Sequence, residues 1–261
     1  GLSDAKSAGT DFTGSLLLGH QTTGTLDAAT YNTGVGLAAL DAITTGDYNV
    51  AVGYDGLTAN TTGASNTAMG YGALKANTTG YYNIAIGTGA YDGADIEHNN
   101  LAIGYDALGG AIDDGTYNVA IGNYSLDANT TGDYGTGVGY NALTSNTTGQ
   151  RNIGIGASAL ATNTTGNYNT ASGYEALTSN TTGNGNTASG YEALKDANRT
   201  ADTDGYNTAL GYQAGNTGTN DVTTGNKNTL LGASSAASAA AGTNQTVIGY
   251  GATGQANNSV T

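Results

Sequence analysis

The chain has 261 residues, of which 44 are glycine and 18 are tyrosine, and it contains no proline, cysteine or tryptophan. The absence of cysteine excludes a disulfide scaffold, thiol catalysis and cysteine-ligated zinc or iron–sulfur sites. The 6 basic and 20 acidic side chains give a formal net charge of −14, which argues against unaided binding to nucleic acid or an anionic membrane. No stretch approaches the ~20 apolar residues needed to cross a bilayer, so we expect no membrane insertion.

A repeat of 17 residues organises the chain. Leu, Ile, Val and Phe are scarce enough to suggest disorder, but the motif Asn-Thr-Ala-x-Gly-Tyr-x-Ala-Leu-x-x-Asn-Thr-Thr-Gly-x-x is nearly intact from Asn66 to Tyr82 and from Asn169 to Gly185. The spacing between copies is 17 residues, except for one of 18 and two of 21. With the first residue of the motif as position 1, the coils begin at Ser15, Asn32, Asn49, Asn66, Asn83, Asn100, Asn118, Gly135, Asn152, Asn169, Asn186, Asn207, Asn228 and Gln245.

This period predicts an all-β parallel β-solenoid of about fourteen coils, each with two short strands and two turns. Positions 2 to 4 alternate large, small and large residues, as in Val50-Ala51-Val52, which is typical of a strand. Positions 8 and 9 are usually Ala-Leu and predict a second buried segment. Asn-Thr-Thr-Gly, found six times, predicts an external turn. Glycine fills position 5 of every coil, which indicates a turn with positive φ or a close backbone approach, as at Gly53, Gly70, Gly87, Gly104, Gly122, Gly139, Gly156, Gly173, Gly190 and Gly211.

The same register divides the chain into three parts. Residues 1–14 are expected to be an N-terminal cap or connecting segment, residues 15–257 the β-solenoid repeat domain, and residues 258–261 the truncated start of a further coil. Stacking the coils at a spacing of ~4.8 Å predicts a rod with a thin core. The small residue at position 3 suggests a flat face that could closely approach another chain. We therefore expect an obligate homotrimer.

The repeat resembles the YadA-like head repeats of trimeric autotransporter adhesins. The 17-residue form with Asn-Thr-Thr-Gly, as in Asn66–Tyr71, looks more like repeats of bacteriophage tail-fibre proteins, notably of cyanophages. The segment Thr246–Thr253 followed by Asn257–Thr261 resembles the region that precedes the C-terminal chaperone of such fibres. The resemblance implies a left-handed parallel β-roll wound as a homotrimer. It also implies a location in a virion tail fibre or appendage, with the bacterial cell surface as the alternative.

Coils that depart from the repeat are the expected places for a binding site. The two spacings of 21 residues bring insertions that carry Lys195, Arg199 and Lys227, half of all the basic side chains. Because insertions in repeat proteins map to loops that often bind partners, we expect any host or partner contact near residues 195–227. The alternative is that these loops are insertions without a role in binding.

Other patterns are weaker. Glu175 and Glu192 share position 7 of adjacent coils, at a separation that could suit a retaining glycosidase, but position 7 is otherwise a varied surface position. His20 and His98 lie several coils apart, so they cannot ligate one metal within a chain. We expect no catalytic residues, no metal and no cofactor.

Tyrosine recurs at positions 6 and 17. Such columns could bind sugars by stacking, but their regular recurrence favours packing within an assembly. The Asn-Thr-Thr tracts formally match glycosylation acceptors and could form a threonine array that binds ice, yet a ladder of turns is the simpler interpretation.

These observations predict a non-catalytic structural fibre or receptor-binding segment of a phage tail or other virion appendage. The alternative is the head domain of a bacterial trimeric surface adhesin. The expected partners are further copies of the chain, other virion or appendage proteins, and a host-cell surface glycan or protein.

Overall fold

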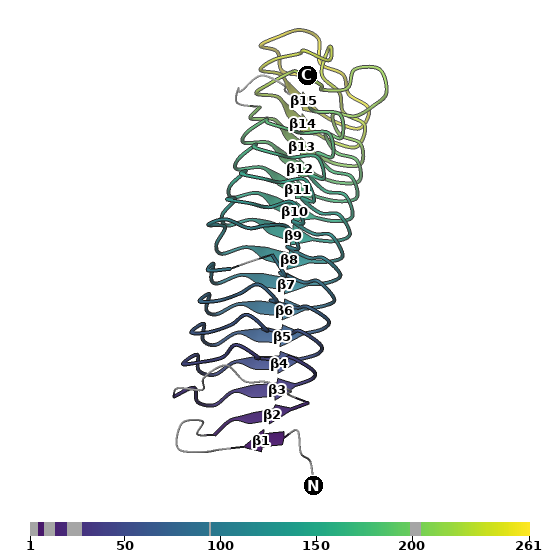
Figure 1. The fold of residues 1–261 in the computed structure, drawn as a ribbon. Helices are drawn as coiled ribbons and strands as arrows, with labels where there is room; N and C mark the ends of the chain where they lie inside the picture. Colours follow the sequence, from purple (N-terminus) through teal and green to yellow (C-terminus); the bar gives the residue numbers. More distant parts are fainter. Residues whose placement is uncertain (1–4, 8–13, 20–27, 94, 199–204) are drawn as a thin grey trace. The chain divides into compact units, whose positions relative to one another are not determined.

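The computed structural model describes residues 5–7, 14–19, 28–93, 95–198 and 205–261. These residues form an all-β parallel β-solenoid of about 13 turns, with no helix among them. The chain forms two compact units, residues 1–131 and residues 132–261. The first runs from purple to teal in Figure 1 and the second from teal-green to yellow.

The first unit begins with an antiparallel pair and continues with parallel strands. Strand β1 pairs antiparallel with β2, and β2 to β8 then pair in parallel, each with its neighbour in the chain. Identical coil positions face each other, as in the pair Ala51–Ala68. The strands are β1 (Ala5–Ser7), β2 (Leu16–Leu18), β3 (Thr33–Val35), β4 (Val50–Val52), β5 (Thr67–Met69), β6 (Ile84–Ile86), β7 (Leu101–Ile103) and β8 (Val119–Ile121).

The second unit repeats the parallel arrangement in register. Its strands pair in chain order from β9 to β15, and the two 21-residue spacings leave the pairing of β12, β13 and β14 in register. The strands are β9 (Thr136–Val138), β10 (Ile153–Ile155), β11 (Thr170–Ser172), β12 (Thr187–Ser189), β13 (Thr208–Leu210), β14 (Thr229–Leu231) and β15 (Thr246–Ile248).

Every strand from β2 to β15 lies at positions 2 to 4 of a coil, which confirms the predicted register. The expectation of a second strand in each coil is wrong for the described residues. The Ala-Leu segment is buried but forms a turn, because positions 7 and 9 have positive φ, as at Asp55 (57°) and Leu57 (51°). Alternating left- and right-handed residues bend the chain at each step, so the segment cannot extend into a strand.

The small residue at position 3 points into the coil rather than toward another chain, so that expectation is also wrong. Ala51 and Ala85 are fully buried, and a Cβ added to Gly154 would lie 3.2 Å from Cγ of Leu143. The leucine at position 9 fills the interior and leaves room opposite for only a small side chain in most coils. The larger residues at positions 2 and 4 therefore point outward, and Ile84 (40%) and Ile155 (44%) are substantially exposed.

The position-5 glycines combine positive φ with very close packing between coils. Gly173 has a φ of 141°, and a Cβ built on it would lie only 2.3 Å from the carbonyl oxygen of Gly190 in the next coil. Gly53 and Gly70 have the same relationship. A side chain at Gly53 or Gly173 would collide with backbone that cannot move without breaking the stack.

A ladder of buried asparagines at position 1 ties successive coils together. Oδ1 of Asn49 accepts hydrogen bonds from both the backbone N–H and Nδ2 of Asn66. Nδ2 of Asn66 also donates to the carbonyl of Gly80 at 2.7 Å. This hydrogen bond joins the beginning and the end of one coil. The second unit repeats this pattern, as at Asn152 and Asn169.

The Asn-Thr-Thr-Gly segment is only partly the external turn that the sequence predicted. Its asparagine, at position 12, is buried and forms a second ladder, in which Nδ2 of Asn77 donates to Oδ1 of Asn60 at 2.8 Å. Nδ2 of Asn163 continues the same pattern in the second unit by donating to Oδ1 of Asn146. Thr62 in the middle of one such turn is exposed. The buried amides favour the turn-ladder interpretation over glycosylation acceptors.

At the C-terminal end, residues after β15 pair with that strand. Backbone N–H of Thr246 donates to the carbonyl of Ser259, and Ile248 donates to Thr261. By the pattern of the other coils, Ser259 rather than Asn258 occupies position 1 of this further coil. Most of residues 1–14 lie outside the described residues.

Candidate functional surfaces

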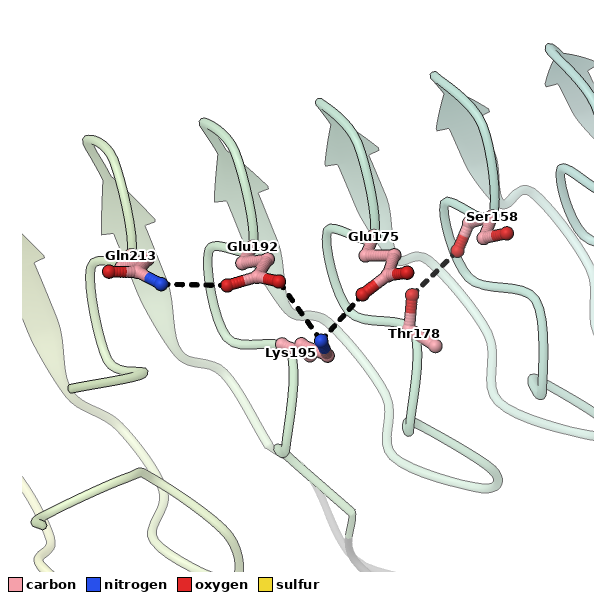
Figure 2. A network of polar contacts seen from close by, with 6 residues as sticks. All are labelled: Ser158, Glu175, Thr178, Glu192, Lys195 and Gln213. Carbon is pink, nitrogen blue, oxygen red and sulfur yellow. Dashed lines mark hydrogen bonds and ion pairs between the residues drawn. The ribbon is translucent and has the colours of Figure 1, made fainter. Parts of the chain in front are cut away.

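Lys195 lies at the centre of a polar network on the surface of the second unit (Figure 2). Its Nζ is 2.6 Å from Oε2 of Glu175 and 3.0 Å from Oε1 of Glu192, so it bridges carboxylates of two coils. Nε2 of Gln213 donates to Glu192 at 2.7 Å, which extends the network to a third coil. Beside it, the Thr178 hydroxyl donates to the carbonyl of Ser158.

The electrostatics of this network do not suit acid–base catalysis. Hydrogen bonds from Lys195 and Tyr174 lower the pKa of Glu175, and hydrogen bonds from Gln213 and Lys195 lower the pKa of Glu192. The two carboxylates in turn raise the pKa of Lys195. A glycosidase pair needs one carboxyl group with a raised pKa to donate a proton. Both glutamates instead remain ionised, and the network joins neighbouring coils.

The structure describes two of the three predicted basic residues, Lys195 and Lys227. The ammonium group of Lys195 is already paired with the carboxylates of Glu175 and Glu192. Lys227 is exposed at position 17, where its backbone has a φ of 57° and its N–H donates to Gly205. Arg199 lies outside the described residues, as do His20 and residues 200–204. The structure therefore separates Lys195 from Lys227 by their positions in the coil.

Where neighbouring coils both carry tyrosine at position 6, the rings can stack on one another, and such stacks occur in both units. The rings of Tyr174, Tyr191 and Tyr212 are 5.2 Å apart with interplanar angles of 13° and 8°. In the first unit, Tyr54 and Tyr71 stack in the same way. Because neighbouring tyrosines cover each other's faces, these stacks offer mainly ring edges and hydroxyls, and a sugar could stack only at their ends.

Position 17 carries a different column in the second unit. There Arg151 lies between two exposed tyrosines, with its Cζ 5.3 Å from the ring centroid of Tyr134 and 5.6 Å from that of Tyr168. Its Nη1 donates to Oε1 of Gln150 and to the hydroxyl of Tyr168, both at 3.3 Å. These contacts fix the plane of an exposed guanidinium group.

Sequence reasoning did not single out Arg151, because its coil has the regular length. A signal was nevertheless present: in the 17-residue register, Arg151 is a basic residue in a column that is otherwise rich in tyrosine. Comparing each residue with its equivalents one coil before and after would have placed Arg151 between Tyr134 and Tyr168.

The remaining acidic groups among the described residues form no cluster that could hold a metal. Burial and the nearby charge of Asp106 raise the pKa of Asp92 and of Asp127. The described part of the chain contains no cluster of three or more metal-ligating side chains and no pocket.

No helix capable of spanning a bilayer occurs among the described residues. The chain matches no protein-family model and no curated protein sequence.

Proposed function

We propose that the chain is a non-catalytic structural or receptor-binding segment of a phage tail fibre or other virion appendage. The observation that carries the proposal is that the inward and outward positions of each coil carry different kinds of side chain. Inward positions build ladders of Asn, Ala and Leu that propagate the fold, while the outward strand positions form an uncharged, largely apolar face. Such a repeating unit supports an elongated assembly rather than a cleft for chemistry.

The outward sheet face supports a homotrimer. Positions 2 and 4 of the fourteen coils contain no charged residue, although the chain has 26 of them. Side chains there include Ile84, Ile86, Ile153 and Ile155, which are all more than a third exposed. An apolar surface that excludes charge is typical of an interface core.

Further copies of the same chain are the occupants that fit this face best. A partner must offer apolar rows at the same coil spacing over many coils, and a parallel copy does so by construction. The isolated chain also has a thin interior, because most coils bury only a few apolar side chains. Association through positions 2 and 4 would bury the exposed isoleucines and valines.

The resemblance of the Asn-Thr-Thr-Gly repeat to tail-fibre repeats favours a virion over a cell surface. The alternative remains the head of a bacterial trimeric adhesin, since both classes share such repeats. Mass spectrometry of purified virions and of the outer-membrane fraction of their host separates the two. We expect peptides of this chain in virions; their presence only in the membrane fraction would support the adhesin.

A further inference from the structure

We propose that Arg151 anchors a binding site for an acidic sugar by receiving its carboxylate. This inference rests on the proposed receptor-binding role and assigns it a place and a ligand class. The site consists of Arg151, the flanking Tyr134 and Tyr168, and the amide side chains of Gln150 and Asn167, and we call it the Arg151 site.

The guanidinium group is held with one edge available. The two tyrosine rings flank it, and Nη1 is anchored by Gln150 and Tyr168. Among the described residues, Nε and Nη2 of Arg151 have no hydrogen-bond partner. These two nitrogens form the side-on edge of the fork that binds a carboxylate through two parallel hydrogen bonds. Little conformational entropy would be lost on binding, because the group is already positioned.

The charge of Arg151 has no carboxylate partner in the described structure. Two lysines, by contrast, are paired with carboxylates. Nζ of Lys75 lies 3.2 Å from Oδ2 of Asp55, and Lys195 bridges two glutamates. In positions 16 and 17 of the second unit, Asp133 is the one acidic residue within the described part. The second unit is also the less acidic half, since residues 132–261 hold 7 of the 20 acidic and 4 of the 6 basic side chains. An anionic group is therefore better tolerated here than in the first unit.

The surroundings favour a sugar over a simple anion. Tyr168 is 61% exposed. In the next coil the same position is Gly185, and the ring of Tyr206 from the coil beyond lies close against it. Aromatic faces bind the apolar face of pyranose rings, and amides pair with hydroxyls. Amides line position 16 beside this column: Oδ1 of Asn167 accepts from the backbone of Gln150, and Oδ1 of Asn184 accepts from that of Asn167.

Binding of a glucuronate-containing tetrasaccharide to the full chain, measured by isothermal titration calorimetry, tests the site. The neutral comparison is the same tetrasaccharide with its carboxylates reduced to primary alcohols. We expect the acidic sugar to bind at least about tenfold more tightly, because charge-assisted hydrogen bonds are roughly twice as strong as bonds between neutral groups. Arg151→Gln should abolish that preference, and Arg151→Lys should lose most of it, because lysine keeps the charge but not the fork.

Lys227→Gln is the matched control. It removes one exposed positive charge from the same column at a residue without flanking cation–π contacts in the described structure, and we expect a change of less than about twofold. Equal losses from Lys227→Gln and Arg151→Gln would show general charge attraction and overturn the proposal. Equal binding of acidic and neutral sugars, or no binding of the acidic sugar by the folded chain, would also overturn it. The outcome of the sugar-binding test does not bear on whether the chain is part of a virion. Mass spectrometry tests that point separately.

Discussion

Asn49 and Asn66 occupy the same position in consecutive coils, and Oδ1 of Asn49 accepts hydrogen bonds from both the backbone and the side chain of Asn66, at 3.0 and 3.2 Å. Both side chains are completely buried. A polar residue in such an interior would be costly alone. Repetition removes the cost, since each asparagine satisfies the next, and this explains how a chain so poor in apolar residues builds a core.

Replacing one ladder asparagine should therefore be strongly destabilising. Asn169→Ala removes a bond to Asn152, a bond to Gly183 and the acceptor for the backbone of Asn186. We expect a loss of about 3 kcal/mol in the free energy of unfolding, because buried partners are left unsatisfied. Denaturant titration followed by circular dichroism measures it. Asn226→Ala, at a half-exposed position, is the control, and similar stability of the two variants would contradict the ladder.

The position-5 glycines should tolerate no side chain. In Gly173→Ala the new Cβ would meet the backbone of Gly190 at 2.3 Å, in addition to the cost of positive φ. We expect a loss above about 3 kcal/mol or failure to fold. Gly218 also has positive φ, but a Cβ there meets nothing within 4 Å. Gly218→Ala should thus lose only the conformational cost, about 1 kcal/mol, when the free energy of unfolding of both variants is measured by denaturant titration. Equal effects would show that the close approach is unimportant.

The Lys195 network should make a pH-dependent contribution to stability. The pKa values of Glu175 and Glu192 are lowered in the folded state. Their contribution is present above the ordinary glutamate pKa of ~4.3 and is lost as pH falls through the lowered folded values.

Lys195→Gln tests this contribution. We expect it to reduce the free energy of unfolding by up to about 1 kcal/mol at pH 7, as for partly exposed ion pairs, and by less at pH 3. Denaturant titrations of both proteins at the two pH values measure the difference, with Lys227→Gln as the control that lacks these carboxylates. An unchanged difference at pH 3 would contradict the assignment.

Chelation should leave the fold unchanged. Hydrogen bonds between side chains and backbone hold the described coils together, and no cluster of metal-ligating side chains occurs among the described residues. We expect the melting temperature with and without EDTA to agree within the error of the measurement. A fall of tens of degrees would reveal a structural metal.

Much of the fold followed from the sequence because the repeat fixes the register. The strand positions were predictable from alternation at residues such as Val50-Ala51-Val52, but alternation does not say which side faces inward. The fully buried Leu57 decides this, since it fills the interior and leaves room only for Ala51. The positive φ of Asp55 and Leu57 was not predictable, because these residue types rarely adopt it without a surrounding stack.

The candidate sites were harder to predict, because their contacts form between coils and not along the chain. The pairing of Lys195 with Glu175 joins residues 20 apart in sequence, which become neighbours only when coils stack. Arg151 likewise meets its tyrosines through the repeat of 17 residues. Reading each column along the coils, rather than each coil along the chain, recovers both relationships.

The outward apolar face predicts that copies of the chain associate, and the mass of the folded protein in solution tests this association. Size exclusion with light scattering should give roughly three times the 25.7 kDa of one chain. Ile153→Asp combined with Ile155→Asp should reduce that mass, because both side chains point outward from β10. A stable, folded wild-type monomer of 25.7 kDa would show that the outward face does not hold copies of the chain together.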